Sequence, residues 1–327
     1  MRLLSPSELP PAFDAELLDI EGFETGPLRL YARATSGGEA TPVLLIHSIN
    51  AAASSYEVRP LFESLAASRP TYALDLPGFG GSARPPRRYT PRLLCDAVLA
   101  AMVRLRERSA TDQVDLVGVS TGCELVARVA LERPGAVRRL ALFSPTGVDR
   151  RGPRRGPPGS TLGRPWVRGA LEPVGGPLFR ALTRPRVIRY FLEHTFGRRE
   201  IDEGLQAYAV QTANVAGAEH APVSFLCGDL FSGDITTVYE GLRLPVWVGH
   251  GTRGDFTDYR GLAPLVRTNG FRVVTYDTGA LPYFEAPQRV AADLERFLTG
   301  PTPPHPRASS ALDTQSVHAD SRDSRRR

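Results

Sequence analysis

Lysine is missing from this 327-residue chain, and all 40 basic residues are arginine. The chain has 35 acidic residues. Two arginine runs stand out, at residues 150–155 and 325–327, and neither is interleaved with aromatic side chains. No nucleic-acid-binding motif accompanies them. We therefore predict a solvated loop and a solvated tail and no nucleic-acid partner, with an anionic partner as the alternative.

Long apolar runs and paired cysteines are also lacking. No segment approaches the roughly 20 apolar residues of a membrane span, so no span is expected. The chain reaches Pro10 and Pro11 before any apolar stretch develops, which predicts no secretory signal and a cytoplasmic location. The three cysteines, Cys95, Cys123 and Cys227, are odd in number and far apart, which fits free thiols better than a disulfide framework or a zinc site. No cofactor and no metal ion are expected.

Short apolar runs alternate with longer amphipathic segments over residues 15–145, which is typical of an α/β fold with a doubly wound, mostly parallel sheet. The predicted strands are 43–46, 71–76, 114–119 and 140–143, with crossover helices at 58–67, 91–108 and 124–132. Residues 17–23 and 28–32 are expected to form a hairpin at the sheet edge. Strand patterns resume at 245–248 and 271–276, and 287–298 is a closing helix.

The composition changes from residue 144, where a loop rich in proline, glycine and arginine precedes helical patterns at 187–195 and 201–213. We therefore predict a core domain of residues 1–145 and 243–300, interrupted by a helical cap at 146–242. Residues 301–327 contain too few apolar side chains to offset the chain entropy of folding, so a disordered tail is expected.

The strongest motif is Gly118-Val119-Ser120-Thr121-Gly122, between an apolar strand and a helix. A sharp turn between strand and helix holds a serine in a strained backbone conformation, and a Cβ atom at either glycine would collide with its neighbours. The turn exposes the hydroxyl at the carboxyl end of the sheet, beside backbone N–H groups that can stabilise an oxyanion. Ser120 is therefore the candidate nucleophile, reachable at the floor of a capped pocket.

Further stretches, in the same order, resemble the α/β-hydrolase superfamily over residues 22–298. His47-Ser48-Ile49-Asn50 resembles its oxyanion loop, which implies the backbone N–H groups of Ile49 and Thr121 as the oxyanion donors. Asp75-Leu76-Pro77-Gly78-Phe79-Gly80-Gly81-Ser82 matches the family's D-x-x-G-x-G-x-S turn, where the aspartate is expected to hold the turn by hydrogen bonds. The inserted helices lie where lidded members carry a cap.

The resemblance also implies an orienting acid after a late strand. Asp255 is the candidate, although it stands one residue further from Gly251 than the usual spacing. Asp258 in the same loop and Asp149 after the strand at 140–143 are the alternatives.

The expected catalytic histidine is absent. Where the family has G-H-x-P-x-x-E, this chain has Gly279-Ala280-Leu281-Pro282-Tyr283-Phe284-Glu285. Without a base a serine hydroxyl is a poor nucleophile at neutral pH. His220 and His250 are the candidate substitutes. The other histidines are expected to be structural or remote: His47 in the oxyanion loop, His194 on a cap helix, and His305 and His318 in the tail.

Two functional hypotheses follow. The first is a serine hydrolase acting on a small ester, thioester or related acyl substrate through Ser120, with Asp255 as the acid. The second is a non-hydrolytic or catalytically silent protein that binds an apolar ligand or a partner, which Ala280 favours. The sequence determines neither the substrate nor the oligomeric state.

Overall fold

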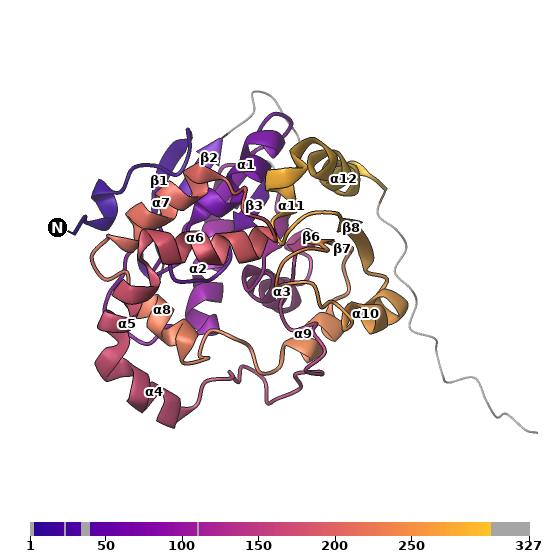
Figure 1. Ribbon diagram of the computed structural model, residues 1–327. Helices are drawn as coiled ribbons and strands as arrows, with labels where there is room; N and C mark the ends of the chain where they lie inside the picture. The colour runs from indigo at the N-terminus through magenta and orange to yellow at the C-terminus, as the bar shows by residue number, and fades with distance from the viewer. Residues whose placement is uncertain (1–2, 23, 34–39, 110, 302–327) are drawn as a thin grey trace, which may run out of the picture.

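The computed structural model describes residues 3–22, 24–33, 40–109 and 111–301 (Figure 1). Within these residues eight strands form one sheet in the order β1-β2-β4-β3-β5-β6-β7-β8. The strands are β1 (Glu16–Gly22), β2 (Gly26–Arg33), β3 (Val43–Ile46), β4 (Thr71–Leu74), β5 (Val114–Val119), β6 (Val137–Phe143), β7 (Val246–Gly251) and β8 (Arg272–Tyr276). The β1–β2 and β2–β4 pairs are antiparallel and the others are parallel. The predicted α/β class, the mostly parallel sheet and the edge hairpin are confirmed.

Helices cover both faces of the sheet because each central strand is apolar on both faces. The core on one face contains Leu116 of β5 together with side chains of α2 (Pro91–Glu107), α3 (Gly122–Glu132) and α10 (Leu262–Asn269). The core on the other face contains Val117 together with side chains of α1 (Arg59–Leu65), α11 (Pro282–Glu285) and α12 (Pro287–Thr299). Alternate residues of one strand thus belong to two separate cores, as expected for a sheet buried on both sides.

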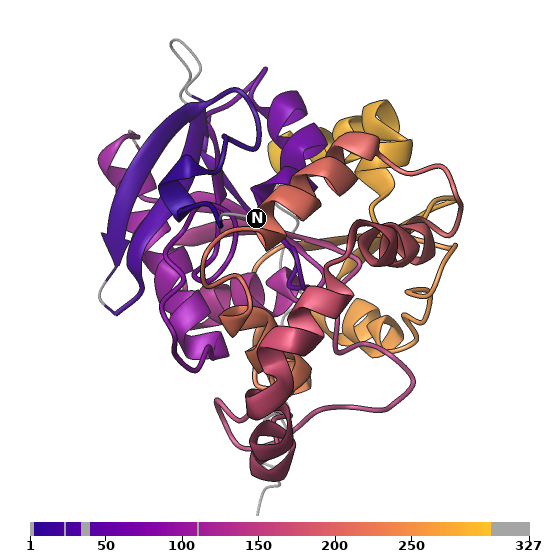
Figure 2. The ribbon, with the colours of Figure 1, turned by 60° about the vertical axis from the view of Figure 1, so that its left-hand side comes forward.

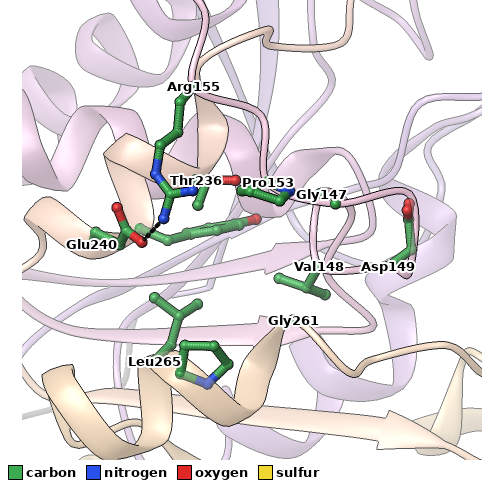
Figure 3. A pocket seen from close by; sticks show the side chains of 12 residues that line it. Gly147, Val148, Asp149, Pro153, Arg155, Thr236, Glu240, Gly261 and Leu265 are labelled. Atoms are coloured by element: carbon green, nitrogen blue, oxygen red, sulfur yellow. Dashed lines mark hydrogen bonds and ion pairs between the residues drawn. The ribbon is translucent and has the colours of Figure 1, made fainter.

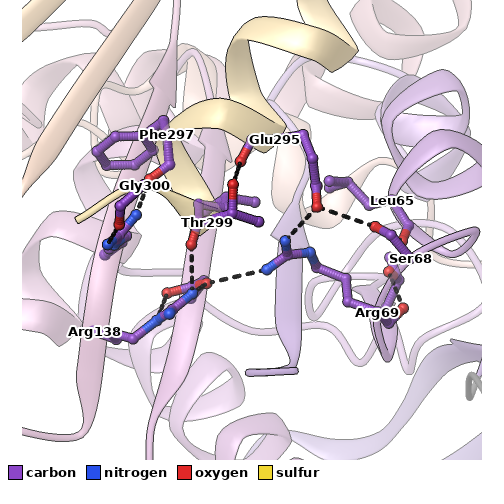
Figure 4. Close-up of polar contacts among 12 residues, drawn as sticks. Leu65, Ser68, Arg69, Arg138, Glu295, Phe297, Thr299 and Gly300 are labelled. Atoms are coloured by element: carbon purple, nitrogen blue, oxygen red, sulfur yellow. Dashed lines mark hydrogen bonds and ion pairs between the residues drawn. The ribbon is translucent and has the colours of Figure 1, made fainter. Parts of the chain in front are cut away.

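A cluster of charged side chains ties the last helix to the amino ends of the strands (Figure 4). Arg69 reaches Glu295 of α12 at 2.6 Å and Asp115 of β5 at 3.7 Å. Arg138 pairs with Asp115 and donates to the carbonyl of Leu298 at 2.9 Å. Asp115 is fully buried, and its two arginine partners offset part of the cost of burying its charge. Burial still raises the pKa of this carboxyl.

Residues 144–245, between β6 and β7, form the insertion, which lies along one side of the sheet (Figures 1 and 2). Its α-helices are α4 (Pro165–Leu171), α5 (Gly175–Leu182), α6 (Pro185–Phe196), α7 (Glu203–Ala213), α8 (His220–Leu226) and α9 (Ile235–Gly241). The division into a core and a separate cap domain stays a prediction. Residues 302–327, almost the whole predicted tail, lie outside the described residues. No helix in the described part of the chain is both long and apolar enough to cross a bilayer.

Candidate active site

Ser120 stands at the turn from β5 into α3 with a backbone φ of +52°. This left-handed region is unfavourable for a residue with a Cβ atom and marks stored strain. The turn is held by two backbone bonds, from Ser120 N to the Phe143 carbonyl (2.8 Å) and from Cys123 N to the Ser120 carbonyl (3.0 Å). The side chain is partly exposed, and its hydroxyl forms no hydrogen bond within the described residues.

The glycines around Ser120 are required by close packing. A Cβ atom at Gly118 would stand 2.7 Å from Cγ2 of Val126, and one at Gly122 would overlap the carbonyl oxygen of His47. We call the turn at residues 118–122 the elbow. It can form only because β3, β5 and α3 approach one another here without side chains between them.

Two backbone N–H groups beside the elbow lack acceptors among the residues that the structure describes. Ile49, in the loop after β3, and Thr121, directly after Ser120, are both buried. The N–H group of neither residue donates to any atom of the described chain. Buried backbone donors are nearly always paired in folded proteins, so unpaired ones indicate a place for a ligand atom. This geometry suits the oxyanion role that the sequence predicts, which stays a prediction.

Polar contacts fix the loop that carries Ile49. The carboxylate of Glu57 accepts from Ser48 N (3.0 Å) and from the Asn50 side-chain amide (2.6 Å). His47 Nε2 accepts from Leu76 N at 3.0 Å, so its Nδ1 carries the proton and donates to the Ser48 carbonyl. Both ring nitrogens are thus engaged, which gives His47 the structural role expected from the sequence.

Asp75 also holds its own turn, as the sequence predicts. Its carboxylate accepts from Ser55 N (2.7 Å) and Gly81 N (2.8 Å). The aspartate therefore stabilises the loops after β3 and β4 and is not available as a catalytic acid.

The position of the missing histidine is covered by the end of α6. Ala280 N donates to the Thr195 carbonyl at 2.8 Å, and the Ser144 hydroxyl donates to the Ala280 carbonyl at 2.7 Å. A Cβ atom at Gly279 would overlap the backbone of Phe196. The Ala280 side chain is 5% exposed. The insertion therefore packs directly on the loop that carries the base in related folds.

Asp255 lies beside the same helix end, because its backbone N donates to the His194 carbonyl at 3.2 Å. Its side chain is exposed, and its carboxylate contacts no donor among the described residues. The structure thus places Asp255 and Ala280 against adjacent carbonyls of α6, although no contact links this carboxylate to an imidazole.

The alternative acids are engaged elsewhere. Asp258 accepts from Arg150 N at 3.0 Å and pairs with Arg260 at 3.3 Å. Asp149 is bound by Arg151 at 2.7 Å, and these hydrogen bonds lower the pKa of its carboxyl. Neither aspartate contacts Ser120.

Comparison with known proteins agrees with the fold. Residues 41–169 match the family model described as the α/β hydrolase fold. A solved probable hydrolytic enzyme from Pseudomonas aeruginosa has a TM-score of 0.70 at 20% identity, covering 91% of this chain and 98% of that one. The chain therefore has the α/β-hydrolase fold.

Curated relatives match only about a third of this chain. A rat protein (Rattus norvegicus) named 1-acylglycerol-3-phosphate O-acyltransferase ABHD5 is 31% identical over 34% of this chain and 31% of its own length. The 2-hydroxymuconate semialdehyde hydrolase of Pseudomonas sp. (strain CF600) is 32% identical over 34% of this chain and 39% of its own. Each match spans less than half of the relative's length. The two relatives have different named activities, so the shared segment does not distinguish between those activities.

The two candidate bases lie on different elements. His250, on β7, stacks on Tyr259 with ring centroids 4.0 Å apart, and its Nδ1 donates to the Gly251 carbonyl at 3.0 Å. Burial lowers the pKa of His250, which favours a neutral imidazole with a free lone pair on Nε2. His220, the first residue of α8, is half-buried, and its ring forms no hydrogen bond within the described residues. Neither ring contacts Ser120.

The remaining histidines add no further candidate base. His194 Nδ1 donates to the Tyr190 carbonyl at 2.8 Å, and its ring packs on that tyrosine. His305 and His318 lie outside the described residues.

Glu124 is a polar site residue that sequence reasoning missed. Its buried carboxylate, four residues after Ser120, accepts from the Thr146 hydroxyl (2.6 Å) and Ser232 N (2.8 Å) and lies 3.5 Å from Arg154. Burial raises its pKa, against these stabilising contacts. The signal available in the sequence was a carboxylate on the otherwise apolar face of a predicted helix. Glu124 thus joins the elbow helix to both ends of the insertion.

Cys123 is a free thiol, as the sequence predicts, and it packs beside the elbow. It is fully buried, and its Sγ lies 3.2 Å from the Gly118 carbonyl and 3.4 Å from that of Phe143. Burial raises the pKa of this thiol, so it stays protonated and a poor nucleophile.

A cavity of about 170 Å³ opens between residues 147–155 and helices α9 and α10 (Figure 3). Val148, Tyr239 and Leu265 supply apolar walls, and Arg155 pairs with Glu240 at 2.5 Å on one side. Ser120 does not line it. The predicted pocket above Ser120 therefore stays a prediction.

Proposed function

We propose that this protein is a serine hydrolase for a small ester, thioester or related acyl substrate, with Ser120 as the nucleophile. The observation that carries this proposal is the strained elbow itself. It presents a partly exposed hydroxyl beside two buried N–H groups, and none of the three groups has a hydrogen-bond partner in the described part of the chain. A fold that needed only packing would gain nothing from retaining this arrangement.

The reaction follows from these groups. Ser120 Oγ attacks the acyl carbon, the carbonyl electron pair moves to oxygen, and Ile49 N–H and Thr121 N–H bind the resulting oxyanion. The proton from Ser120 passes to a base and then to the leaving alkoxide or thiolate as its bond to the acyl carbon breaks. Water hydrolyses the acyl-enzyme in the second half, with the same proton route.

His250 is the preferred base in this proposal. Its Nδ1 proton is held by the Gly251 carbonyl, so Nε2 is the proton acceptor, and its lowered pKa keeps the ring neutral at neutral pH. The Gly251 carbonyl thereby orients the His250 ring. This is the part that the sequence assigns to Asp255, whose loop lies beside position 280 at the end of α6. His220 is the alternative base.

A ligand-binding, non-hydrolytic protein is the second candidate. The bond from Ala280 N to the Thr195 carbonyl favours it, because the insertion covers the place from which related enzymes present their base. In that case the Ser120 pocket would hold an apolar ligand or a partner segment without turning it over.

A fluorophosphonate probe and p-nitrophenyl acetate distinguish the two candidates. We expect the wild type to be labelled and to hydrolyse the ester, and Ser120→Ala to do neither. Loss of the base in His250→Gln should lower kcat by about 10²- to 10⁴-fold, with His220→Gln as the matched variant. Equal turnover by wild type and Ser120→Ala would exclude the serine mechanism. Complete inertness of a folded wild type would support the binding protein.

A further inference from the structure

Helix α4 and its flanks project from the molecule with their apolar side chains uncovered. We call residues 162–174 the α4 tip. No residue of α4 is buried, and Trp166 is 70% exposed. Leu162 and Val174 at its two ends are also exposed large apolar residues. Figures 1 and 2 both show α4 at the lower extremity of the molecule, away from the sheet. Single exposed apolar residues are common, but three in one short projecting segment indicate an interaction surface.

The α4 tip lies within a strongly basic part of the chain. Residues 151–186 contain eight arginines and a single acidic residue, Glu172, whereas the whole chain has a net charge of only +5. The remainder of the protein is therefore slightly acidic. Four of the eight arginines are paired with acidic residues from outside this segment. The other four have no acidic partner among the described residues, and their charge steers the protein toward an anionic surface.

A cavity of about 210 Å³ places three of the arginines at the start of the α4 tip. Arg88, Arg164 and Arg168 line it together with the buried Asp229. The Asp229 carboxylate pairs with Arg88 at 2.8 Å and also with Arg168. The Arg164 guanidinium has no acceptor among the described residues. Arg168 also pairs with Glu172 at 3.0 Å. Three cations thus face two carboxylates, and the positive charge left over, on Arg164, suits a phosphate group.

We propose that the α4 tip docks on a membrane surface rich in anionic phospholipid. Trp166, Leu162 and Val174 enter the interfacial layer, and the arginine cavity receives a lipid phosphate. Tryptophan is favoured at this depth because its ring is apolar and its N–H is polar. The convex shape of the tip fits a lipid surface, whereas a protein or nucleic-acid partner would need a matching groove or stacked bases. This docking does not depend on the chemistry of Ser120.

Vesicle flotation with the full chain tests the proposal. We expect binding to mixed phosphatidylcholine and phosphatidylglycerol vesicles, weak binding to phosphatidylcholine alone, and weakening by salt. Trp166→Ala should lower the partition coefficient about tenfold, because the buried ring is lost. Arg164→Ala should lower it about fivefold. Val103→Ala on α2 and Arg267→Ala on α10, both exposed and distant in sequence, are the matched controls and should bind as the wild type.

The fluorescence of Trp166 supplies an independent measurement. The chain has two tryptophans, and Trp247 is buried, so Trp247→Phe leaves Trp166 as the reporter. Its emission should shift to the blue on adding anionic vesicles. Absence of binding, or equal binding by Trp166→Ala, overturns the proposal. A blue shift that rises with protein concentration without vesicles would instead identify a second copy on this surface. Binding to polyphosphate that Arg164→Ala weakens, without vesicle binding, would identify a soluble anion.

Discussion

The two ends of the sheet differ in whether their buried polar groups have hydrogen-bond or ion-pair partners. At the amino ends, the buried carboxylate of Asp115 is enclosed by Arg69 and Arg138, and the same arginines hold α12. At the carboxyl ends, the Ser120 hydroxyl and the N–H groups of Ile49 and Thr121 have no partners in the described chain. The polar groups at the amino ends therefore hold a helix in place, whereas those at the carboxyl ends are available to a ligand.

This difference separates stability from function by position in the fold. Parallel strands direct the loops that follow them to their carboxyl ends, where strain and unpaired donors accumulate in the elbow. The Asp115 carboxylate is paired with two arginines. Its removal should therefore lower the stability of the fold and leave the chemistry of Ser120 intact. The elbow should behave in the reverse way.

The largest expected effect comes from breaking the amino-end cluster. Asp115→Asn leaves Arg69 and Arg138 facing a neutral side chain, and loss of one member of a buried ion pair costs about 3 to 5 kcal/mol. Ser120→Ala should change the free energy of unfolding by less than about 0.5 kcal/mol, because its hydroxyl has no partner to lose. Urea denaturation of both variants measures the contrast. Equal stability losses would show that the two ends are not specialised as described.

A smaller loss is expected from filling the elbow. In Gly122→Ala the added Cβ atom would overlap the His47 carbonyl, and overpacking of this kind costs about 1 to 3 kcal/mol. Gly169→Ala is the matched control, because Gly169 lies in α4 with no atom near the added Cβ. This control should raise stability by about 0.5 to 1 kcal/mol through helix propensity. Thermal melts compare the two, and a harmless Gly122→Ala would contradict the close approach of β3 and α3.

The smallest expected effect concerns His250 and pH. Burial lowers its folded-state pKa below the ordinary value of 6.5, so the unfolded chain binds this proton first as pH falls. The contribution of His250 to stability is thus complete above about pH 6.5 and is lost progressively below it. Urea midpoints measured from about pH 8 to about pH 5 should fall less steeply for His250→Asn than for the wild type. Identical slopes would place His250 in a solvated setting.

Local patterns predicted much of the scaffold. The strands at 43–46 and 114–119 were predicted with the bounds that the structure has, because both are short apolar runs buried on each face. The strand predicted at 245–248 extends instead to Gly251 as β7. Glycines discourage strand assignment, but Gly249 leaves room for the Trp247 ring, since a Cβ there would stand 2.5 Å from it. Long-range packing of this kind has no local signature.

The sequence by itself determined the elbow, the turn at Asp75 and the absence of a histidine at position 280, because each depends on residues adjacent in the chain. Only the tertiary structure decided what surrounds them. Thr195 and Ala280 are 85 positions apart, and nothing near either residue encodes their hydrogen bond. The same holds for Glu124, whose partners Thr146 and Ser232 come from the two ends of the insertion. Such contacts depend on the balance of packing across the whole fold, which no local pattern contains.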